Sequence, residues 1–288
     1  MKEVSGDNHE TERVSIRAKE TKTGSQEITV LGRSRREIHS REVAQERVEG
    51  FHQDSVTRIL QKDGRFMSES DQIRVSSGAD EIKAVEHTPN QGWTGRYRLI
   101  NGQSEIEVSA LDPEQMERST LHETQHFASK NLETVVPDPE GKGYTVYQRV
   151  GIRQSRWHHS FETGEDTDVS VTGRGMNEGL TTMYTNRQLY EISREKGLTA
   201  ERQGIYAHAT ELCGQLEDIV GEDTLKKAYY GGDLKSLETK VDELAGKGGY
   251  ESLRDCMDRT LSRDYVERIS AMVEAQDILK RMYDNGGM

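Results

Sequence analysis

The segment that most constrains the fold runs from His122 to His126 and reads His-Glu-Thr-Gln-His. On a helix, two histidines four residues apart point in nearly the same direction and lie about 6 Å apart. Their ring nitrogens can then both reach one zinc ion at about 2.0–2.1 Å. Glu123 lies about 100° further round the helix, so it flanks the metal and can act as general base toward the attacking water.

The residues around this segment favour a helix. Asp112 is a good N-cap and Pro113 suits the first helical position. Spacings of seven and four place three apolar residues on one stripe, so we expect this face to be buried. The stripe consists of Leu121, Ala128 and Leu132.

A catalytic zinc site usually has three protein ligands and one open position. The best candidate for the third ligand is Glu178, in the sequence Gly175-Met-Asn-Glu-Gly-Leu-Thr-Thr-Met-Tyr-Thr185 at the start of a second predicted helix. The adjacent His158 and His159 are rivals, and so are four nearby carboxylates. These are Glu162, Glu165, Asp166 and Asp168.

The two motifs together resemble those of the gluzincins, metallopeptidases in which the Glu of an Asn-Glu-Gly helix is the third zinc ligand. The sequences of the motifs are most similar to those of the aminopeptidase-N-like enzymes and of many bacterial metallopeptidases. The resemblance covers about residues 112–190. It implies that His122, His126 and Glu178 bind zinc and that Glu123 is the base.

The chain departs from the family pattern at two places. Glu178 follows His126 by 52 residues, a longer gap than in aminopeptidase-N-like enzymes, so the intervening segment must fold back. Thr182 stands where thermolysin-like enzymes have an acidic residue that supports the metal ligands. Metzincins are excluded, because their Gly and His positions hold Ser129 and Leu132.

Hydrolysis of a peptide builds negative charge on the carbonyl oxygen, which a Tyr or His donor can stabilise by roughly 3–4 kcal/mol. Tyr206 and His208 are the candidates for this role, although Tyr206 fits equally well as a packing residue. Three further tyrosines are weaker candidates: Tyr184, Tyr229 and Tyr265. We also expect the strand Glu105–Ala110 to pair with an extended substrate.

Pattern along the chain predicts an α+β fold of zincin-like type. Residues 1–44 form a polar tail, disordered or loosely attached. Residues 33–51 are compatible with a polar helix that begins in this tail and could run on to residue 60. Residues 45–175 hold the active helix and a small twisted sheet at 72–110, with a hairpin at Asn101-Gly102. Residues 144–152 form a strand, 154–175 an irregular connection, and 176–288 a helical subdomain.

Composition limits the partners. The net charge is −12, and it lies wholly in residues 51–288, because residues 1–50 carry ten basic and ten acidic side chains. Such a body repels nucleic acid and anionic membranes. Cys213 and Cys256 are too few for a disulfide framework, so we expect reduced core thiols.

No apolar run of about 18 residues predicts a membrane helix, and the N-terminus lacks the apolar region of a signal peptide. We therefore expect a cytoplasmic protein or one exported without such a signal. The polar tail is compatible with a delivered effector or toxin domain. The oligomeric state is left open.

The sequence thus predicts a zinc metallopeptidase that cleaves internal bonds of a polypeptide. Two alternatives stay open. One is an inactive zincin-fold binding module that keeps the metal without turnover. The other is a helical interaction protein in which the His-Glu-Thr-Gln-His segment has no chemical role.

Overall fold

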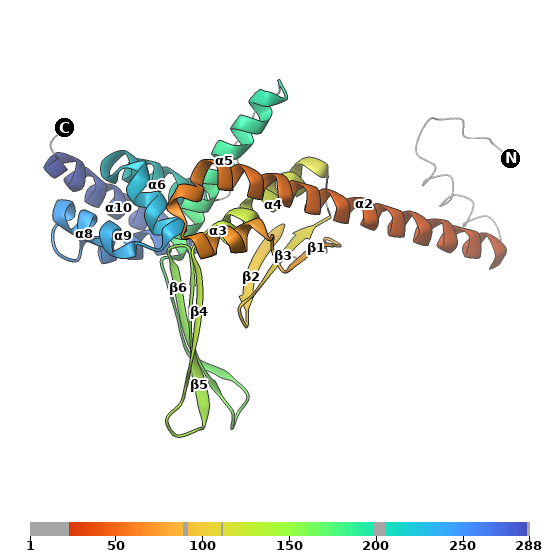
Figure 1. Ribbon diagram of the computed structural model, residues 1–288, viewed down its shortest axis with the longest axis horizontal. Coiled ribbons are helices and arrows are strands. Elements are labelled where there is room, and N and C mark those ends of the chain that lie inside the picture. The colour runs from red at the N-terminus through yellow and green to blue at the C-terminus, as the bar shows by residue number, and fades with distance from the viewer. Residues whose placement is uncertain (1–22, 89–91, 111, 198–205, 287–288) are drawn as a thin grey trace.

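The computed structural model describes residues 23–88, 92–110, 112–197 and 206–286, with side chains from residue 41 onward. The fold is mixed α+β (Figure 1). The helices are α2 (Thr23–Asp63), α3 (Glu69–Ser76), α4 (Pro113–Ala128), α5 (Arg174–Glu195), α6 (Ala207–Val220), α7 (Glu222–Lys226), α8 (Leu234–Ala245), α9 (Gly249–Arg259) and α10 (Tyr265–Gly286). Two short turns complete them, the 3-10 turn η1 (Gly64–Phe66) and the π-helical turn η2 (Lys227–Gly231).

A three-stranded sheet packs against α2 and α4. Its strands are β1 (Glu81–Val85), β2 (Gly95–Ile100) and β3 (Gln103–Ser109). The order is β1-β3-β2, with β1 parallel and β2 antiparallel to the central β3. The predicted hairpin at Asn101-Gly102 is confirmed, and both residues adopt the positive φ that a tight turn of this kind requires, 53° and 76°.

The second sheet projects from the helical body as a narrow arm (Figure 1). It is a meander of four antiparallel strands in chain order, which we call the β-arm. Its strands are β4 (Asn131–Pro137), β5 (Gly143–Val150), β6 (Arg153–Ser160) and β7 (Asp166–Thr172). Only β5 was predicted. The expectation of an irregular connection at 154–175 is wrong, because polar residues exposed on most of the arm hide its strand pattern.

Two further expectations are corrected. Residues 73–77 look β-rich but belong largely to helix α3, whose N-cap Ser68 accepts a hydrogen bond from the Asp71 amide. A good cap here outweighs a short β-prone run. Leu132 does not extend the stripe of α4, because that helix ends at Ala128 and Leu132 lies exposed in β4.

The N-terminal region is helical from Thr23 in the structure, and residues 1–22 lie outside the described part. The boundary predicted at residue 44 therefore falls inside α2. From Ala44 onward the helix contributes buried side chains to the main core. That core also holds residues from α4, β3, α5, α6, η2 and the last helices, among them Phe127, Ile106, Leu180, Leu212, Tyr229 and Met257.

The C-terminal half is helical as predicted, from Ala207 to Gly286 among the described residues. Both cysteines are free and buried, which confirms reduced core thiols. No helix in the described ranges combines the length and the apolar character that crossing a membrane requires.

Helices α5 and α6 approach closely because Gly179 has no side chain. A Cβ there would lie 2.5 Å from the Ala209 carbonyl oxygen and 2.7 Å from Cys213 Sγ. We expect Gly179→Ala to lower the free energy of unfolding by roughly 1–3 kcal/mol through overpacking. Gly214→Ala, in α6 with open space around it, is the matched control and should add about 0.5–1 kcal/mol. Urea unfolding of both variants measures this, and a Gly179→Ala protein as stable as the parent would contradict it.

Candidate metal centre

Helix α4 carries both histidines of the motif. It begins as predicted, with the Asp112 side chain accepting hydrogen bonds from the amides of Glu114 and Gln115. His122 and His126 are one turn apart and both buried, at 6% and 7% exposure. Their rings lie edge to face, with centroids 4.9 Å apart. The helix therefore presents two imidazoles from one face.

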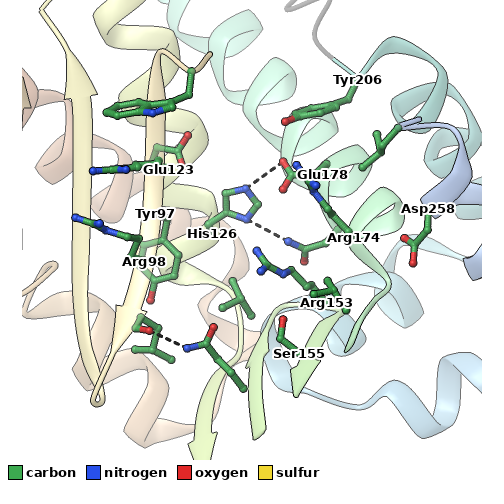
Figure 2. Close-up of a pocket in the computed structure, with 18 of the residues that line it drawn as sticks. Tyr97, Arg98, Glu123, His126, Arg153, Ser155, Arg174, Glu178, Tyr206 and Asp258 are labelled. Atoms are coloured by element: carbon green, nitrogen blue, oxygen red, sulfur yellow. Dashed lines mark hydrogen bonds and ion pairs between the residues drawn. The ribbon is translucent and has the colours of Figure 1, made fainter. Parts of the chain in front are cut away.

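Helix α5 supplies the third group. Glu178 Oε2 lies 3.3 Å from His122 Nε2 and 3.4 Å from His126 Nε2. Ligand atoms at about 2.0–2.1 Å from a tetrahedral ion are separated by roughly 3.3–3.4 Å. Among the described residues this trio is the group of His, Cys, Asp and Glu side chains that could hold a metal ion. Figure 2 shows Glu178 facing His126 across the opening of the site.

The β-arm spans the long stretch of sequence between His126 and Glu178. Four antiparallel strands carry the chain out and back twice, so α5 starts where α4 ended. At the base of the arm, the Gly151 amide donates to the Lys130 carbonyl at 2.8 Å, and the Ile152 amide donates to Asn177 Oδ1 at 3.0 Å. The predicted fold-back is thus present in the structure.

Asp258 fixes the start of α5. Its carboxylate accepts hydrogen bonds from the amides of Gly173 and Gly175, at 2.8 and 2.6 Å. A negative charge at a helix N-terminus is favourable. Burial raises the pKa of Asp258, and the two amides oppose that rise. Because Glu178 lies one turn into α5, this contact helps to set the position of its carboxylate.

The back of His126 is held by α5. Its Nδ1 lies 3.3 Å from Thr181 Oγ1 and 3.2 Å from Asn177 Nδ2. Thr181 Oγ1 is also 2.8 Å from the Tyr229 hydroxyl, which donates to the Gln125 carbonyl. Partners of this kind orient a metal-binding histidine. His122 Nδ1 is buried without a hydrogen-bond partner in the described residues.

This support differs from the family pattern at Thr182. The Thr182 hydroxyl is buried and has no partner within the described residues, so it does not replace the acidic group of thermolysin-like enzymes. Thr181, three residues after Glu178 and thus on the same helix face, supports the site instead. The three-residue spacing between Glu178 and Thr181 was the sequence signal from which this supporting role could have been predicted.

Glu123 stands beside the group of three, against the edge strand β2. A Cβ at Gly95 would lie 2.9 Å from both Cγ and Oε1 of Glu123, so only glycine leaves room there without movement. Burial raises the pKa of Glu123 to about 7, with His122 lowering it and Glu178 raising it. Burial would also raise the pKa of Glu178, but the two imidazoles outweigh it and hold that pKa well below its usual range.

A cleft of about 1180 Å³ opens onto these side chains. One wall is β2, from Gly95 to Ile100, and another is the inner face of the β-arm. The strand expected to pair with a substrate was Glu105–Ala110, and this expectation is wrong. The strand there, β3, is central and already bonded on both sides, while the free edge along the cleft belongs to β2.

Tyr206 lies in the cleft and His208 does not line it. The Tyr206 ring stacks near His122, with centroids 6.3 Å apart. Its backbone has a φ of 59°, a left-handed conformation that is unfavourable for tyrosine and often occurs at functional sites. Burial raises the pKa of Tyr206 to about 12. The weaker candidates Tyr184 and Tyr229 are buried outside the cleft, and Tyr265 is exposed.

The rival ligands lie elsewhere. His158 and His159 are on β6, where His159 Nδ1 pairs with Asp166 at 2.9 Å and His158 Nδ1 lies 3.3 Å from Thr145. None of the rival side chains belongs to the group around His122 or lines the cleft. The remaining rivals are Glu162, Glu165 and Asp168.

Sequence reasoning missed three groups at the cleft: Asp258, Arg153 and Arg174. Asp258 lies in a helical segment 80 residues after Glu178, and no motif marks it. The two arginines flank the strands that were read as an irregular connection. Comparisons with known protein families, with curated proteins and with solved structures find no match.

The Thr181 contact predicts a difference between two adjacent threonines. Thr181→Val removes the hydroxyl behind His126, so we expect zinc affinity to fall roughly 10- to 100-fold. Thr182→Val removes a hydroxyl that has no partner in the described residues, so zinc affinity should stay within about twofold. Competition with a chromophoric chelator measures both. Equal losses in the two variants would show that Thr181 does not support the site.

Proposed function

We propose that the protein is a zinc-dependent metallopeptidase of gluzincin type. The observation that carries the proposal is the convergence of His122, His126 and Glu178 at ligand spacing, with Glu123 buried beside them at the cleft. The motif helix under a small sheet, with a second helix bringing Glu178, supports a zincin-like arrangement. Two imidazoles and a carboxylate suit zinc among the divalent ions.

When bound, zinc would polarise the scissile carbonyl and acidify water. Glu123 would take the proton from the attacking water and deliver it to the leaving amine. A pKa of about 7 suits both steps at neutral pH, because the group can hold and release a proton. The contact with Gly95 and the backbone of Tyr97 keeps its carboxylate at the cleft wall.

The substrate we propose is an extended polypeptide cleaved at an internal bond. Among the described residues no strand pairs with the outer edge of β2 along the cleft, so an extended chain can add a strand there. The cleft continues along Ser155, Trp157 and Val171 on the arm, so it accommodates residues beyond the reacting centre. Tyr206, which lines the cleft beside His122, would donate a hydrogen bond to the oxyanion.

An inactive binding module with the same fold is the alternative. The argument for it is that Thr182 stands where thermolysin-like enzymes have an acidic residue, so the metal ligands would be too weakly supported for turnover. The Thr181 hydroxyl weakens that argument, because it can accept a hydrogen bond from Nδ1 of His126 and so orient the ring without an acidic residue.

Replacing the base separates these alternatives. We expect Glu123→Gln to lower the rate of cleavage of denatured casein roughly 100- to 10,000-fold while zinc stays bound, because only the proton acceptor is lost. Glu178→Gln is the contrasting variant and should weaken zinc binding. Fluorescence release from labelled casein and metal analysis measure the two effects. Cleavage by Glu123→Gln at the parent rate would exclude it as base, and no cleavage by the zinc-loaded parent would favour the binding module.

A further inference from the structure

The charges that line the cleft are unevenly paired. Five arginines line it among the described residues, and three of them have carboxylate partners. These pairs are Arg96 with Glu107, Arg98 with Glu105 and Arg259 with Glu274. Arg153 and Arg174 form no ion pair with any residue in the described ranges. Both lie on the same side of the cleft as Glu178 (Figure 2).

Arg153 is the first residue of β6, at the base of the arm. Its Nε is buried and has no hydrogen-bond partner within the described residues. Burial lowers the pKa of Arg153, the charge of Glu178 raises it, and Arg174 lowers it. The two guanidinium groups are therefore close enough to repel each other. An arginine stays charged at neutral pH even so, which leaves an unsatisfied donor at the cleft wall.

Arg174 is the first residue of α5, four positions before Glu178. Its charge opposes the rise in the pKa of Tyr206, so its guanidinium lies near the Tyr206 hydroxyl. Glu178 is the acidic group whose charge raises the pKa of Arg153, and its Oε2 lies against the two histidines. A bound divalent ion would increase the positive charge on this wall further.

Three further carboxylates line the cleft, and each has another partner or position. Asp258 is engaged by the amides of Gly173 and Gly175, Glu123 lies across the cleft against β2, and Glu267 accepts a hydrogen bond from the Ser262 hydroxyl. A guanidinium presents a planar fork of donors that matches a carboxylate in a bidentate pair. The chain as a whole carries a net charge of −12, so this cationic wall stands against an acidic body.

We propose that Arg153 and Arg174 bind a carboxylate of the peptide, so that the cleft selects substrates with an acidic group close to the scissile bond. This specificity rests on the proposed peptidase function. The carboxylate can come from an acidic side chain or from the C-terminus of the peptide, and the same guanidinium fork recognises either.

Binding, not cleavage, tests the proposal. The protein is the zinc-loaded Glu123→Gln variant of the full chain, and the probes are four pools of octapeptides that carry an uncharged dye. The pools differ in two features: the central position is Glu or Gln, and the C-terminus is free or amidated. All other positions are randomised among uncharged residues. Fluorescence anisotropy gives the affinity of each pool.

We expect pools with a carboxylate to bind roughly 10- to 100-fold more tightly than the Gln amide pool, as for a hydrogen bond to a charged group. The central Glu pool and the free C-terminus pool identify which source is used. The preference should shrink to less than about threefold in Arg153→Gln and in Arg174→Gln. Arg156→Gln, on the same strand but stacked on Tyr147 and outside the cleft, is the matched control and should keep it.

Zinc affinity checks that the variants keep their fold. Removing a positive charge near the ion should leave zinc binding in Arg153→Gln equal or tighter, whereas a misfolded variant would lose it. If Arg153→Gln loses zinc, the peptide affinities are measured with Arg153→Lys and Arg174→Gln instead. Equal affinity for all four pools, or a preference that survives both arginine variants, overturns the proposal.

Failure of the peptidase function gives a different result. If the parent cleaves casein but the Glu123→Gln variant binds all pools equally, the proposed carboxylate site is contradicted and the peptidase function is supported. If the carboxylate pools bind through the two arginines but the parent cleaves no peptide, the carboxylate site is supported and the peptidase function is contradicted.

Discussion

The packing of α5 against α4 is the constraint on which the site depends. It places the carboxylate of Glu178 between two buried imidazoles, at 3.3 and 3.4 Å. Burying a carboxylate is costly unless charged or hydrogen-bonding groups surround it. A cation shared by these three side chains would offset that cost. The same packing also places Thr181 behind His126, so one helix supplies both a candidate ligand and a hydrogen-bond partner for another candidate ligand.

The position of α5 is determined by groups far away in the sequence. Asp258 in α9 holds its first amides, and Gly179 allows α6 to approach it. The β-arm returns the chain to the end of α4 before α5 begins. The helical C-terminal half thus positions the metal centre, although none of its residues belongs to the group of three.

Local signals were sufficient for part of this structure. The cap at Asp112 and Pro113 at the first helical position predicted the start of α4, and Asn101-Gly102 predicted the hairpin. Both signals act within a few residues, where backbone geometry depends on local sequence. The prediction of Glu178 as the third group came from the resemblance to gluzincins, and the structure brings this residue to the histidines.

Non-local features could not be predicted in this way. Most of the β-arm is exposed, so its strands lack the apolar alternation that marks a half-buried sheet. Strand order decided that β2, and not β3, has the free edge, and pattern alone does not give strand order. The roles of Asp258, Arg153 and Arg174 depend on contacts across the fold, for which a single sequence holds no local signal.

Metal content tests the central claim most directly. Elemental analysis would measure bound zinc per chain in the purified protein and in a Glu178→Ala variant. Circular dichroism would check that the variant keeps the fold of the parent. We expect the parent to hold one equivalent after dialysis and the variant to lose it, because two imidazoles alone leave the ion weakly held. A parent without zinc, or a variant that retains the full equivalent, would contradict the account.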